Sequence, residues 1–591
     1  MPGLAGIITG ASAADAKAKL AKMIEAMCHE SFYTSGSRID ETMGAFIGWT
    51  ARRGSFGDGM PLVNRSGNVA LMFSGEDYSS GGCASRRSTL VHGYEADAAA
   101  FPDTLDGIFH GVVMDGRSGR TILFNDRYGL HRLYYHEAED GLYFAAEAKA
   151  ILAVCPELRG VDARGLSEYV AFGCTLENRT LFRGINLVPP GSRWTFRNAV
   201  LEKKETYFDP TAWESQPALD GDTYYDQLRD VVARSLPSYL RGPEAAAVAI
   251  TGGLDTRMIM AWSGASPGSL PCYTFGGELR DSRDVAIGRQ VASLCGQTHH
   301  VIRVGEEYLS RFPHYSERTV YLTDGAVGVG NSPDLYVSEQ ARRIAPAKIV
   351  GTWGSELLGQ AVLFKPASAE PHLYDHDFCQ RVHQAAHTYA AVRRGHPVTF
   401  AAFRQTPWFQ YGIEALEQTQ LTVRAPFLSG DFVRTVYRAP QRSEADVRMR
   451  LIHDGNPLLA GIPSDRGVSP GRIGPRGIAA RLTEAVLFKA EYLLDMGMPQ
   501  WFAPADRLLA PLGVERLFLG RHKFYHFRTW YRHRLQHHIR EVLLDPGSTT
   551  RPYLRPGGLA RIVEDHIAGL SNHTTTIHTA LTLEYLHRHF G

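Results

Sequence analysis

The chain has 591 residues, and its 63 basic and 62 acidic side chains leave a net charge of +1 with histidine neutral. This balance gives no electrostatic reason to bind nucleic acid or an anionic membrane, and the composition is that of a soluble globular protein. Seven scattered cysteines without a Cys-x-x-Cys pair argue against a disulfide framework or structural zinc and predict a cytoplasmic location. No segment has the roughly 18 uninterrupted apolar residues of a membrane span, and no signal peptide is evident at the N-terminus.

From Met1 to about Pro210, short apolar runs alternate with Gly, Asp and Asn. They predict the strands of an antiparallel, layered α/β domain, with helices at 14–28 and 147–153. The clearest strand candidates are Ala5–Ile8, Val69–Phe73, Gly111–Met114 and Arg120–Phe124.

Residues 211–591 have a different sequence pattern. The polar segment Thr211–Asp222 predicts a linker, and a helix from about Tyr224 to Leu236 is expected to stop at Pro237. Apolar strand candidates then alternate with helical patterns, which predicts a doubly wound parallel sheet. The strands are expected at 245–250, 271–275, 299–304 and 348–350, the helices at 281–296 and 331–342, and a helical extension from about 478.

The first of these strands is followed by Thr251, Gly252, Gly253, Leu254, Asp255 and Thr256, and then by a helix that begins near Leu254. A strand, a glycine turn and a helix N-terminus form an anion site, because backbone N–H groups and the helix dipole point into the turn. The threonine hydroxyls add donors, and the Asp255 carboxylate can hold Mg²⁺ against phosphates. The alternative is that Gly-Gly only turns the chain.

This turn resembles the Ser-Gly-Gly-Leu-Asp-Ser signature of the PP-loop ATP pyrophosphatases, with threonine in both hydroxyl positions. The N-terminal part resembles the class II glutamine amidotransferase fold that precedes the synthetase half of asparagine synthetase. Three segments carry that resemblance in the family's order: Asp106–Phe109, Asn125–Tyr135 and Phe144–Lys149. The resemblance implies an Ntn-hydrolase-like αββα domain over 1–210 and an ATP-dependent synthetase domain over 211–591.

The residues that carry amidotransferase chemistry in the family are not all present in this sequence. Active members start Met-Cys-Gly-Ile, but Pro2 stands at the cysteine position here, and proline has no side-chain nucleophile. The family's Asn-Gly-Glu appears as Ser74-Gly75-Glu76, while Arg52-Arg53-Gly54 matches its Arg-Gly. We therefore expect no glutaminase activity and a scaffold that packs against the synthetase half.

The segment Gly351–Gly359 resembles Gly-Glu-Gly-Ser-Asp-Glu-Leu-Phe-Gly, whose backbone holds pyrophosphate in asparagine synthetases. Gly351, Gly354 and Ser355 are expected to contact the nucleotide. Thr352 replaces the first acid, a position that tracks the nature of the nucleophile, and Ser355 replaces the metal-binding Asp. Glu356 remains, so the metal would be held by Asp255 and Glu356, with Asp324 as another source of a carboxylate.

Other matches complete the expected site. Thr274, Phe275 and Gly276 would border the adenine, and Asp284 is either an acid at that site or a first-turn helix residue. Arg424–Leu428 resembles Arg-x-Pro-Phe-Leu. Arg466 is the candidate cation near the transferring phosphate, unless it is a surface-loop arginine.

The resemblance implies an amide-forming ligase that uses ATP and Mg²⁺ to activate a carboxylate as its acyl-adenylate. The substrate would be a small molecule or peptide, and ammonia or an amine would be the nucleophile. Intramolecular closure, as in β-lactam synthetases and lasso-peptide cyclases, is one alternative, and a nucleotide-binding homologue without catalysis is another. Homodimer formation stays open.

Overall fold

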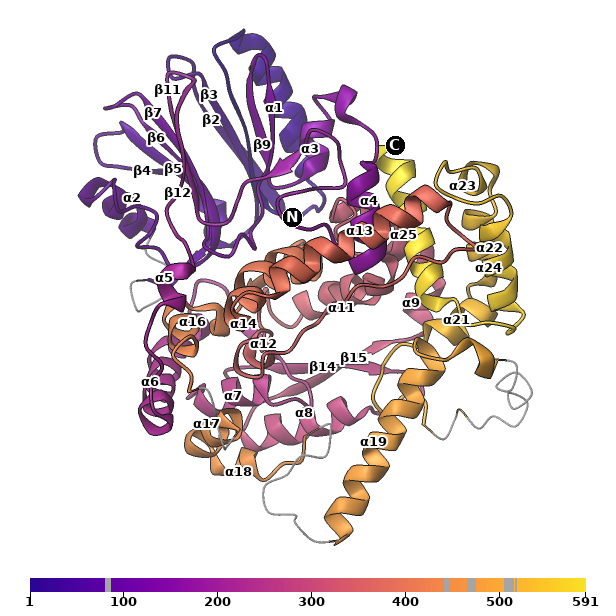
Figure 1. Cartoon of the computed structure of the whole chain (residues 1–591). Helices are drawn as coiled ribbons and strands as arrows, with labels where there is room; N and C mark the ends of the chain where they lie inside the picture. The colour runs from indigo at the N-terminus through magenta and orange to yellow at the C-terminus, as the bar shows by residue number, and fades with distance from the viewer. Residues whose placement is uncertain (80–86, 441–445, 465–474, 504–514, 516–517) are drawn as a thin grey trace.

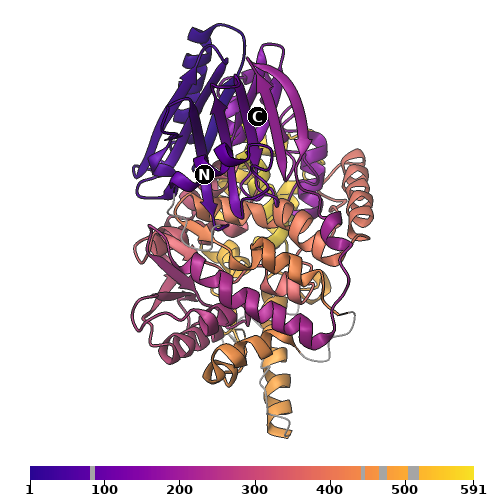
Figure 2. The same ribbon diagram turned by 90° about the vertical axis from the view of Figure 1, so that its left-hand side faces the viewer.

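The computed structural model describes residues 1–79, 87–440, 446–464, 475–503, 515 and 518–591. Two antiparallel sheets form the N-terminal part at the top of Figure 1, and a parallel sheet with many helices forms the C-terminal part below it. Figure 2 shows the same two-tier arrangement from the side. In the described ranges, no helix combines the length and the apolar content needed to cross a membrane.

The N-terminal part is a pair of six-stranded sheets. In the first the strand order is β10-β8-β9-β1-β3-β2, and in the second it is β12-β11-β7-β6-β5-β4. Apolar side chains of β1, β3, β5, β6 and β7 fill the space between the sheets, as expected for stacked sheets with alternating inward residues. The strands are β1 (Gly3–Ile8), β2 (Tyr33–Asp40), β3 (Ala45–Arg52), β4 (Leu62–Val63), β5 (Val69–Asp77), β6 (Gly107–Asp115), β7 (Arg120–Asn125), β8 (Tyr134–Ala138), β9 (Gly141–Ala145), β10 (Asn186–Leu187), β11 (Ser192–Arg197) and β12 (Val200–Thr206).

Helices cover this pair of sheets and confirm the layered α/β prediction. Helix α1 packs on β1 and β3, and α2 packs on β4 and β5. The four helices are α1 (Ala13–Met27), α2 (Arg87–Ala96), α3 (Ala148–Leu152) and α4 (Ala163–Phe172).

The C-terminal part is built on a five-stranded sheet in the order β15-β14-β13-β16-β17, in which every neighbouring pair is parallel. This confirms the predicted doubly wound sheet, and the chain reverses its strand order at β13. Ligands of such sheets bind at the carboxyl ends of the strands, beside the switch point. The strands are β13 (Ala246–Ala249), β14 (Cys272–Gly277), β15 (His299–Val304), β16 (Ala347–Ile349) and β17 (Thr422–Arg424).

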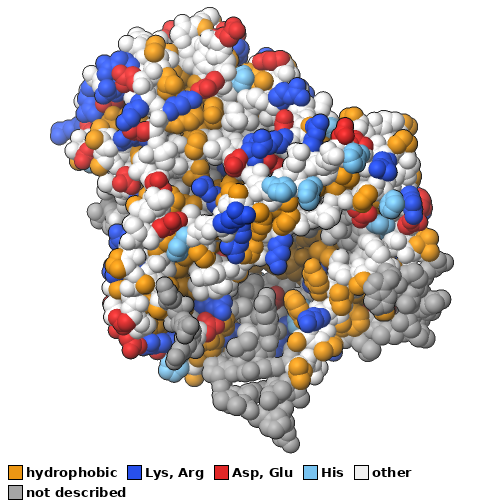
Figure 3. Space-filling view, in the orientation of Figure 1, with side chains coloured by type: hydrophobic (Ala, Val, Ile, Leu, Met, Phe, Trp, Pro, Cys, Tyr) orange, Lys and Arg blue, Asp and Glu red, His pale blue; other side chains and the backbone are white. Residues whose placement is uncertain are grey.

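Helices surround this sheet and make up most of the described residues after Pro475. One of them, α19, projects from the body in Figures 1 and 2, and Figure 3 shows apolar side chains gathered where it adjoins the body. The helices are α5 (Thr211–Glu214), α6 (Gly221–Leu240), α7 (Asp255–Trp262), α8 (Arg283–Leu294), α9 (Glu306–Ser310), α10 (Phe312–Leu322), α11 (Ser332–Arg342), α12 (Gly354–Leu358), α13 (His376–Arg393), α14 (Pro397–Phe400), α15 (Tyr411–Gln418), α16 (Gly430–Val436), α17 (Val447–Gly455), α18 (Pro457–Ala460), α19 (Pro475–Asp495), α21 (Phe527–His533), α22 (Gln536–Leu543), α23 (Pro546–Thr549), α24 (Gly558–Ile567) and α25 (Thr574–Phe590).

The prediction that Pro237 stops the helix was wrong, because α6 continues to Leu240 with the proline inside it. A proline removes one backbone hydrogen bond, but tertiary packing outweighs that loss here. Tyr239 is 2% exposed and stacks on Tyr78 of the N-terminal part with ring centroids 3.8 Å apart. Burial of this ring holds the last turn of α6 in place.

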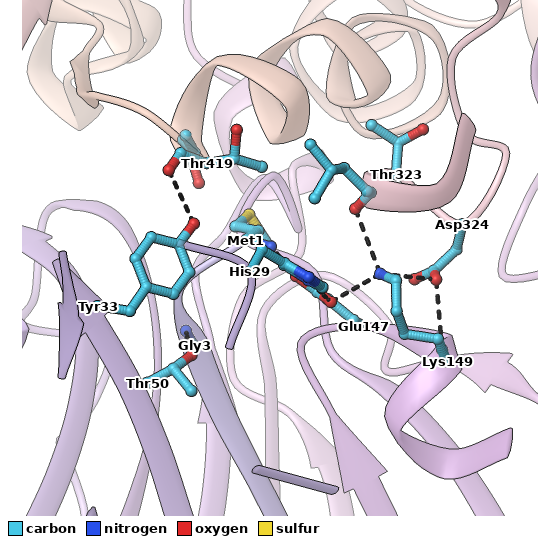
Figure 4. A network of polar contacts seen from close by, with 12 residues as sticks. Met1, Gly3, His29, Tyr33, Thr50, Glu147, Lys149, Thr323, Asp324 and Thr419 are labelled. Carbon is cyan, nitrogen blue, oxygen red and sulfur yellow. Dashed lines mark hydrogen bonds and ion pairs between the residues drawn. The ribbon is translucent and has the colours of Figure 1, made fainter. Parts of the chain in front are cut away.

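Buried polar contacts join the two parts, and Figure 4 shows one such network. Lys149 Nζ lies 2.6 Å from Glu147 Oε2 and 3.0 Å from Asp324 Oδ1, and all three side chains are at most 4% exposed. On the other side of the network, Tyr33 donates a hydrogen bond to the Thr419 carbonyl over 2.8 Å. Buried charges require such pairing, so the interface is fixed by specific partners as well as by apolar area.

Candidate functional site

The glycine turn lies at the carboxyl end of β13, and α7 begins directly after it. Thr251 is exposed and Leu254 and Asp255 are half-buried, so one side of the turn faces solvent. The Gly252 N–H donates to Asp284 Oδ1 over 2.8 Å, and the Thr251 N–H lies 3.3 Å from Thr256 Oγ1. A carboxylate oxygen of the chain itself therefore occupies one amide of the turn.

Asp255 is held in place by Ser355. Ser355 Oγ donates to Asp255 Oδ2 over 2.7 Å. The other oxygen, Oδ1, is buried and has no hydrogen-bond partner among the described residues. Burial raises the pKa of Asp255, while the Ser355 hydrogen bond and the Arg448 charge lower it. A buried carboxylate oxygen without a donor is a position suited to a cation.

Glu356 presents a second such oxygen. Its side chain is 7% exposed, and Oε2 has no partner within the described ranges, whereas Oε1 lies 3.5 Å from Gln410 Nε2. Burial, together with the negative charge of Asp255, raises the pKa of Glu356 to about 7. The two carboxyl groups are close enough to repel each other, and a divalent cation between them would relieve that repulsion.

The two predicted nucleotide-binding segments pack directly against each other. A Cβ added at Gly351 would lie 2.6 Å from the Thr256 backbone nitrogen, and one added at Gly354 would lie 2.8 Å from Asp255 Cγ. Both positions therefore require glycine. Thr352, between Gly351 and Trp353, is half-buried at the same loop.

Trp353 has a backbone conformation that is unusual for a residue with a large side chain. It lies in the left-handed region at φ +78° and is fully buried, and its indole N–H donates to Thr406 Oγ1 over 2.8 Å. Thr406 belongs to a π-helical stretch, Ala401–Gln410, which also brings Gln410 to Glu356. Strained backbone of this kind persists only where the surroundings fix it, and here it positions the start of α12.

The sequence analysis missed Arg448. Its guanidinium is held by Asp446 through hydrogen bonds of 2.9 and 2.8 Å, and Nη1 donates to Ser355 Oγ over 3.1 Å. This places a cation beside Asp255, on the side of Ser355. The position of Arg448 on α17, almost a hundred residues after Ser355, gave no signal in the sequence.

The predicted cation, Arg466, lies outside the described residues. The chain just before it does reach the turn, because buried Arg257 donates to the Ile462 carbonyl over 2.5 Å and to the Gly252 and Pro463 carbonyls over 3.3 Å each. Ile462 and Pro463 are thereby tied to the glycine turn.

The remaining predicted residues divide into two groups. Phe275 and Gly276 lie within the last three residues of β14. Thr274, on the same strand, donates to the Ile250 carbonyl over 2.8 Å, so its hydroxyl links β14 to the residue that follows β13. The expectation that Asp324 supplies a carboxylate to this site was wrong. Asp324 accepts hydrogen bonds from the backbone of α3 in the N-terminal part and pairs with Lys149, so its charge is already compensated elsewhere.

A second polar site lies between the two parts, where the resemblance places the amidotransferase pocket. It is a cavity of about 60 Å³, and its lining includes Pro2, Arg52, Ser74, Glu76, His131 and Arg424. Arg52 donates to the Gln418 carbonyl and to Thr422 Oγ1. Arg424, which is fully buried, donates to both Glu76 oxygens over 2.9 Å. The C-terminal part therefore engages both Arg52 and Glu76 in this cavity.

Comparison with known proteins identifies relatives of both parts. Residues 1–208 match the model of a glutamine amidotransferase domain. Asparagine synthetase [glutamine-hydrolyzing] 1 of Bacillus subtilis (strain 168) is 23% identical over 381 residues, covering 61% of this chain and 58% of the relative. Asparagine synthetase [glutamine-hydrolyzing] 2 of Arabidopsis thaliana is 23% identical over 433 residues, covering 69% of this chain and 63% of the relative.

The chain thus spans about three fifths of the length of these curated relatives. One solved structure that matches is glutamine phosphoribosylpyrophosphate amidotransferase from B. subtilis, complexed with ADP and GMP. The match covers 51% of this chain and 81% of that chain, at 14% identity and a TM-score of 0.22. The amidotransferase domain model covers the first third of the chain, and the asparagine synthetases match most of it. Both matches agree with the motifs found in each part. The chain is therefore similar to the asparagine synthetases, and its residues 1–208 match a glutamine amidotransferase domain.

Proposed function

We propose that the chain is an ATP-dependent carbon–nitrogen ligase that activates a carboxylate as its acyl-adenylate and transfers the acyl group to ammonia or an amine. The observation that carries this proposal is the pair of buried carboxylate oxygens, Asp255 Oδ1 and Glu356 Oε2, that lack partners in the described structure beside a glycine turn. The two relatives described above are both named asparagine synthetase, and this supports an amide-forming reaction.

The residues fit ATP with Mg²⁺. Asp255 and Glu356 would hold the ion, and the amide of Gly253, with Thr251 and Thr256, would bind phosphate oxygens. The amide of Gly252 would join them once phosphate displaces Asp284 Oδ1 from it. Gly351 and Gly354 keep the second loop close to the first. Bound Mg²⁺ would neutralise phosphate charge. Arg448 and Arg466 would add fixed positive charge for the leaving pyrophosphate, and Phe275 and Gly276 would border the base.

The reaction balances as two displacements. A carboxylate oxygen of the substrate bonds to the α-phosphorus of ATP, and the bond to the β-phosphate oxygen breaks to release pyrophosphate. The amine nitrogen then bonds to the acyl carbon, AMP leaves, and the nitrogen loses a proton. Activation is needed because a carboxylate at neutral pH is a poor electrophile.

We further propose that glutamine is not the nitrogen donor. Pro2 offers no thiol, and the Arg52 and Glu76 side chains are engaged by Gln418, Thr422 and Arg424. The N-terminal part would then serve as a scaffold for the C-terminal part, with the division near residue 210.

The test is pyrophosphate release from ATP and Mg²⁺ with a panel of small and peptide carboxylates, with ammonia, amines or glutamine added separately. Turnover with ammonia or an amine and none with glutamine supports the proposal. Turnover by a substrate that carries its own amine would indicate intramolecular closure. ATP binding without pyrophosphate release from any substrate would favour a nucleotide-binding homologue without catalysis.

A further inference from the structure

The cavity between the two parts contains a serine and a histidine in direct contact. Ser74 lies on β5 and His131 follows β7, and both line the cavity beside Pro2. Ser74 Oγ is 2.9 Å from His131 Nε2. Both side chains are buried, at 8% and 5% exposure, so bulk water does not compete for this contact.

A third residue fixes the direction of the hydrogen bond. His131 Nδ1 is 3.1 Å from the amide oxygen of Gln418, at the end of α15. An amide oxygen only accepts, so Nδ1 carries the proton and Nε2 has the lone pair. Ser74 Oγ–H must therefore donate to Nε2. Ser74 is then placed as the nucleophile, His131 as its base and Gln418 as the acceptor that orients the base. This order of groups activates a serine hydroxyl.

A second histidine holds the His131 ring. His110 stacks on it with ring centroids 4.2 Å apart and an interplanar angle of 22°. His110 Nε2 accepts from the Leu4 backbone N–H over 3.1 Å, and Nδ1 lies 3.2 Å from the His131 carbonyl. Burial, with the neighbouring His110, lowers the pKa of His131 well below its ordinary value, which keeps the ring neutral at pH 7.

The cavity also contains a donor for a ligand. Arg52 is 8% exposed, and its Nε has no hydrogen-bond partner among the residues described. The space of about 60 Å³ has room for roughly four to six waters at 10–15 Å³ each. These dimensions suit a compound of a few non-hydrogen atoms with an oxygen acceptor for the guanidinium.

We propose that Ser74, His131 and Gln418 form a second reactive site, in which Ser74 is a nucleophile toward small acyl compounds such as short esters and primary amides. Ser74 Oγ bonds to the acyl carbon while its proton passes to His131 Nε2, and that proton goes to the departing alcohol or ammonia. Water then hydrolyses the acyl-serine and gives the carboxylic acid. The site includes Gln418 from the C-terminal part, so it is complete only when both parts are docked.

This site does not depend on nucleotide, so its test is separate from that of the ligase. The full chain is treated with methanesulfonyl fluoride, a serine reagent with five non-hydrogen atoms, and the adduct is mapped by mass spectrometry. The oxygen–sulfur bond forms as fluoride leaves. We expect one adduct on Ser74, absent in Ser74→Ala and unchanged in Ser66→Ala, whose exposed hydroxyl contacts Asn64 and Asn68.

Two variants test the base and its orientation. His131→Gln should slow labelling by about 10²-fold or more, the range of general-base catalysis. Gln418→Met should slow it also, from a position outside the N-terminal part, whereas Gln418→Glu keeps the acceptor and should retain labelling. Asp255→Asn should label like the wild type, which separates this site from the nucleotide site.

Hydrolysis is measured as acetic acid release from methyl acetate. Release by the wild type that is lost in Ser74→Ala supports the full reaction. Labelling without release would overturn the hydrolytic step. No adduct on Ser74, or equal labelling of folded His131→Gln and Gln418→Met proteins, would overturn the whole assignment.

Discussion

Ser355 and Asp255 are 100 residues apart in the chain, and Ser355 Oγ donates to Asp255 Oδ2 over 2.7 Å. The hydroxyl occupies one carboxylate oxygen and fixes the rotamer, which leaves Oδ1 as the oxygen available to a metal. In the asparagine synthetase pattern the position of Ser355 is an acid. The serine therefore removes one negative charge from the site and gives Asp255 a neutral donor.

Asp255→Asn should weaken Mg²⁺-dependent ATP binding by at least about 10-fold, because one of two anionic ligands becomes a neutral amide. Folding should survive, since burial already raises the pKa of Asp255 and the amide avoids a buried charge. Isothermal titration with ATP, with and without Mg²⁺, measures the effect. Asp222→Asn is the matched control, because the Asp222 side chain near the start of α6 is exposed. Equal ATP affinity in both variants would remove Asp255 from the site.

Glu356 gives the site a pH dependence. Its pKa is raised from 4.5 to about 7 in the folded chain, so the folded state holds the proton more tightly than the unfolded state. Without ligand, this contribution to stability is complete below pH 4.5 and is lost as pH rises through 7. At 1.36 kcal/mol per pKa unit, the loss at pH 8 is at most about 3 kcal/mol.

Glu356→Gln should therefore raise the melting temperature of the ligand-free protein at pH 8 and leave it nearly unchanged at pH 5. The same substitution should remove the rise in Mg²⁺ affinity that we expect in the wild type between pH 6 and 8. A melting temperature that falls equally at both pH values would show that Glu356 acts only through packing.

Local patterns in the sequence were sufficient for the two kinds of sheet and for the glycine turn. A buried strand, two glycines and a helix start are encoded within about fifteen consecutive residues, so the position of Asp255 at the start of α7 follows from them. The extent of α6 did not follow, because Tyr239 is stabilised by Tyr78, a residue from the other part of the chain. Pairings of that kind have no local signal.

Residues of the candidate site could be predicted only where they fall within a family motif. Glu356 was identified from its motif, but its raised pKa depends on burial and on Asp255, which lies about a hundred residues earlier. From the sequence, Asp324 was also considered as a source of a missing carboxylate. Its partners, Lys149 and the α3 backbone, lie far away in sequence, and only the docked structure shows that it serves the interface.

Arg448→Met should lower ATP affinity by about 10- to 100-fold, in line with 1.5–3 kcal/mol for a hydrogen bond to a charged group. Arg448 Nη1 lies 3.1 Å from Ser355 Oγ, where the guanidinium can also meet pyrophosphate. Arg450→Met is the control, because Arg450 is on the same helix but stacks on Tyr225 and pairs with Asp222. Equal losses in both variants would indicate a general effect on α17. Equilibrium dialysis with labelled ATP makes the comparison.

Arg424 and Glu76 form a buried ion pair between the two parts, with both guanidinium contacts at 2.9 Å. Arg424→Met leaves the Glu76 carboxylate buried without its cation, and removing one partner of such a pair costs about 3–5 kcal/mol. We expect Arg424→Met to unfold at lower denaturant concentration and to be cleaved faster by protease. Glu76→Gln combined with Arg424→Met should recover part of that loss, because no uncompensated charge remains. If the double variant is as unstable as the sum of the two single variants, the pair contributes through shape rather than through charge.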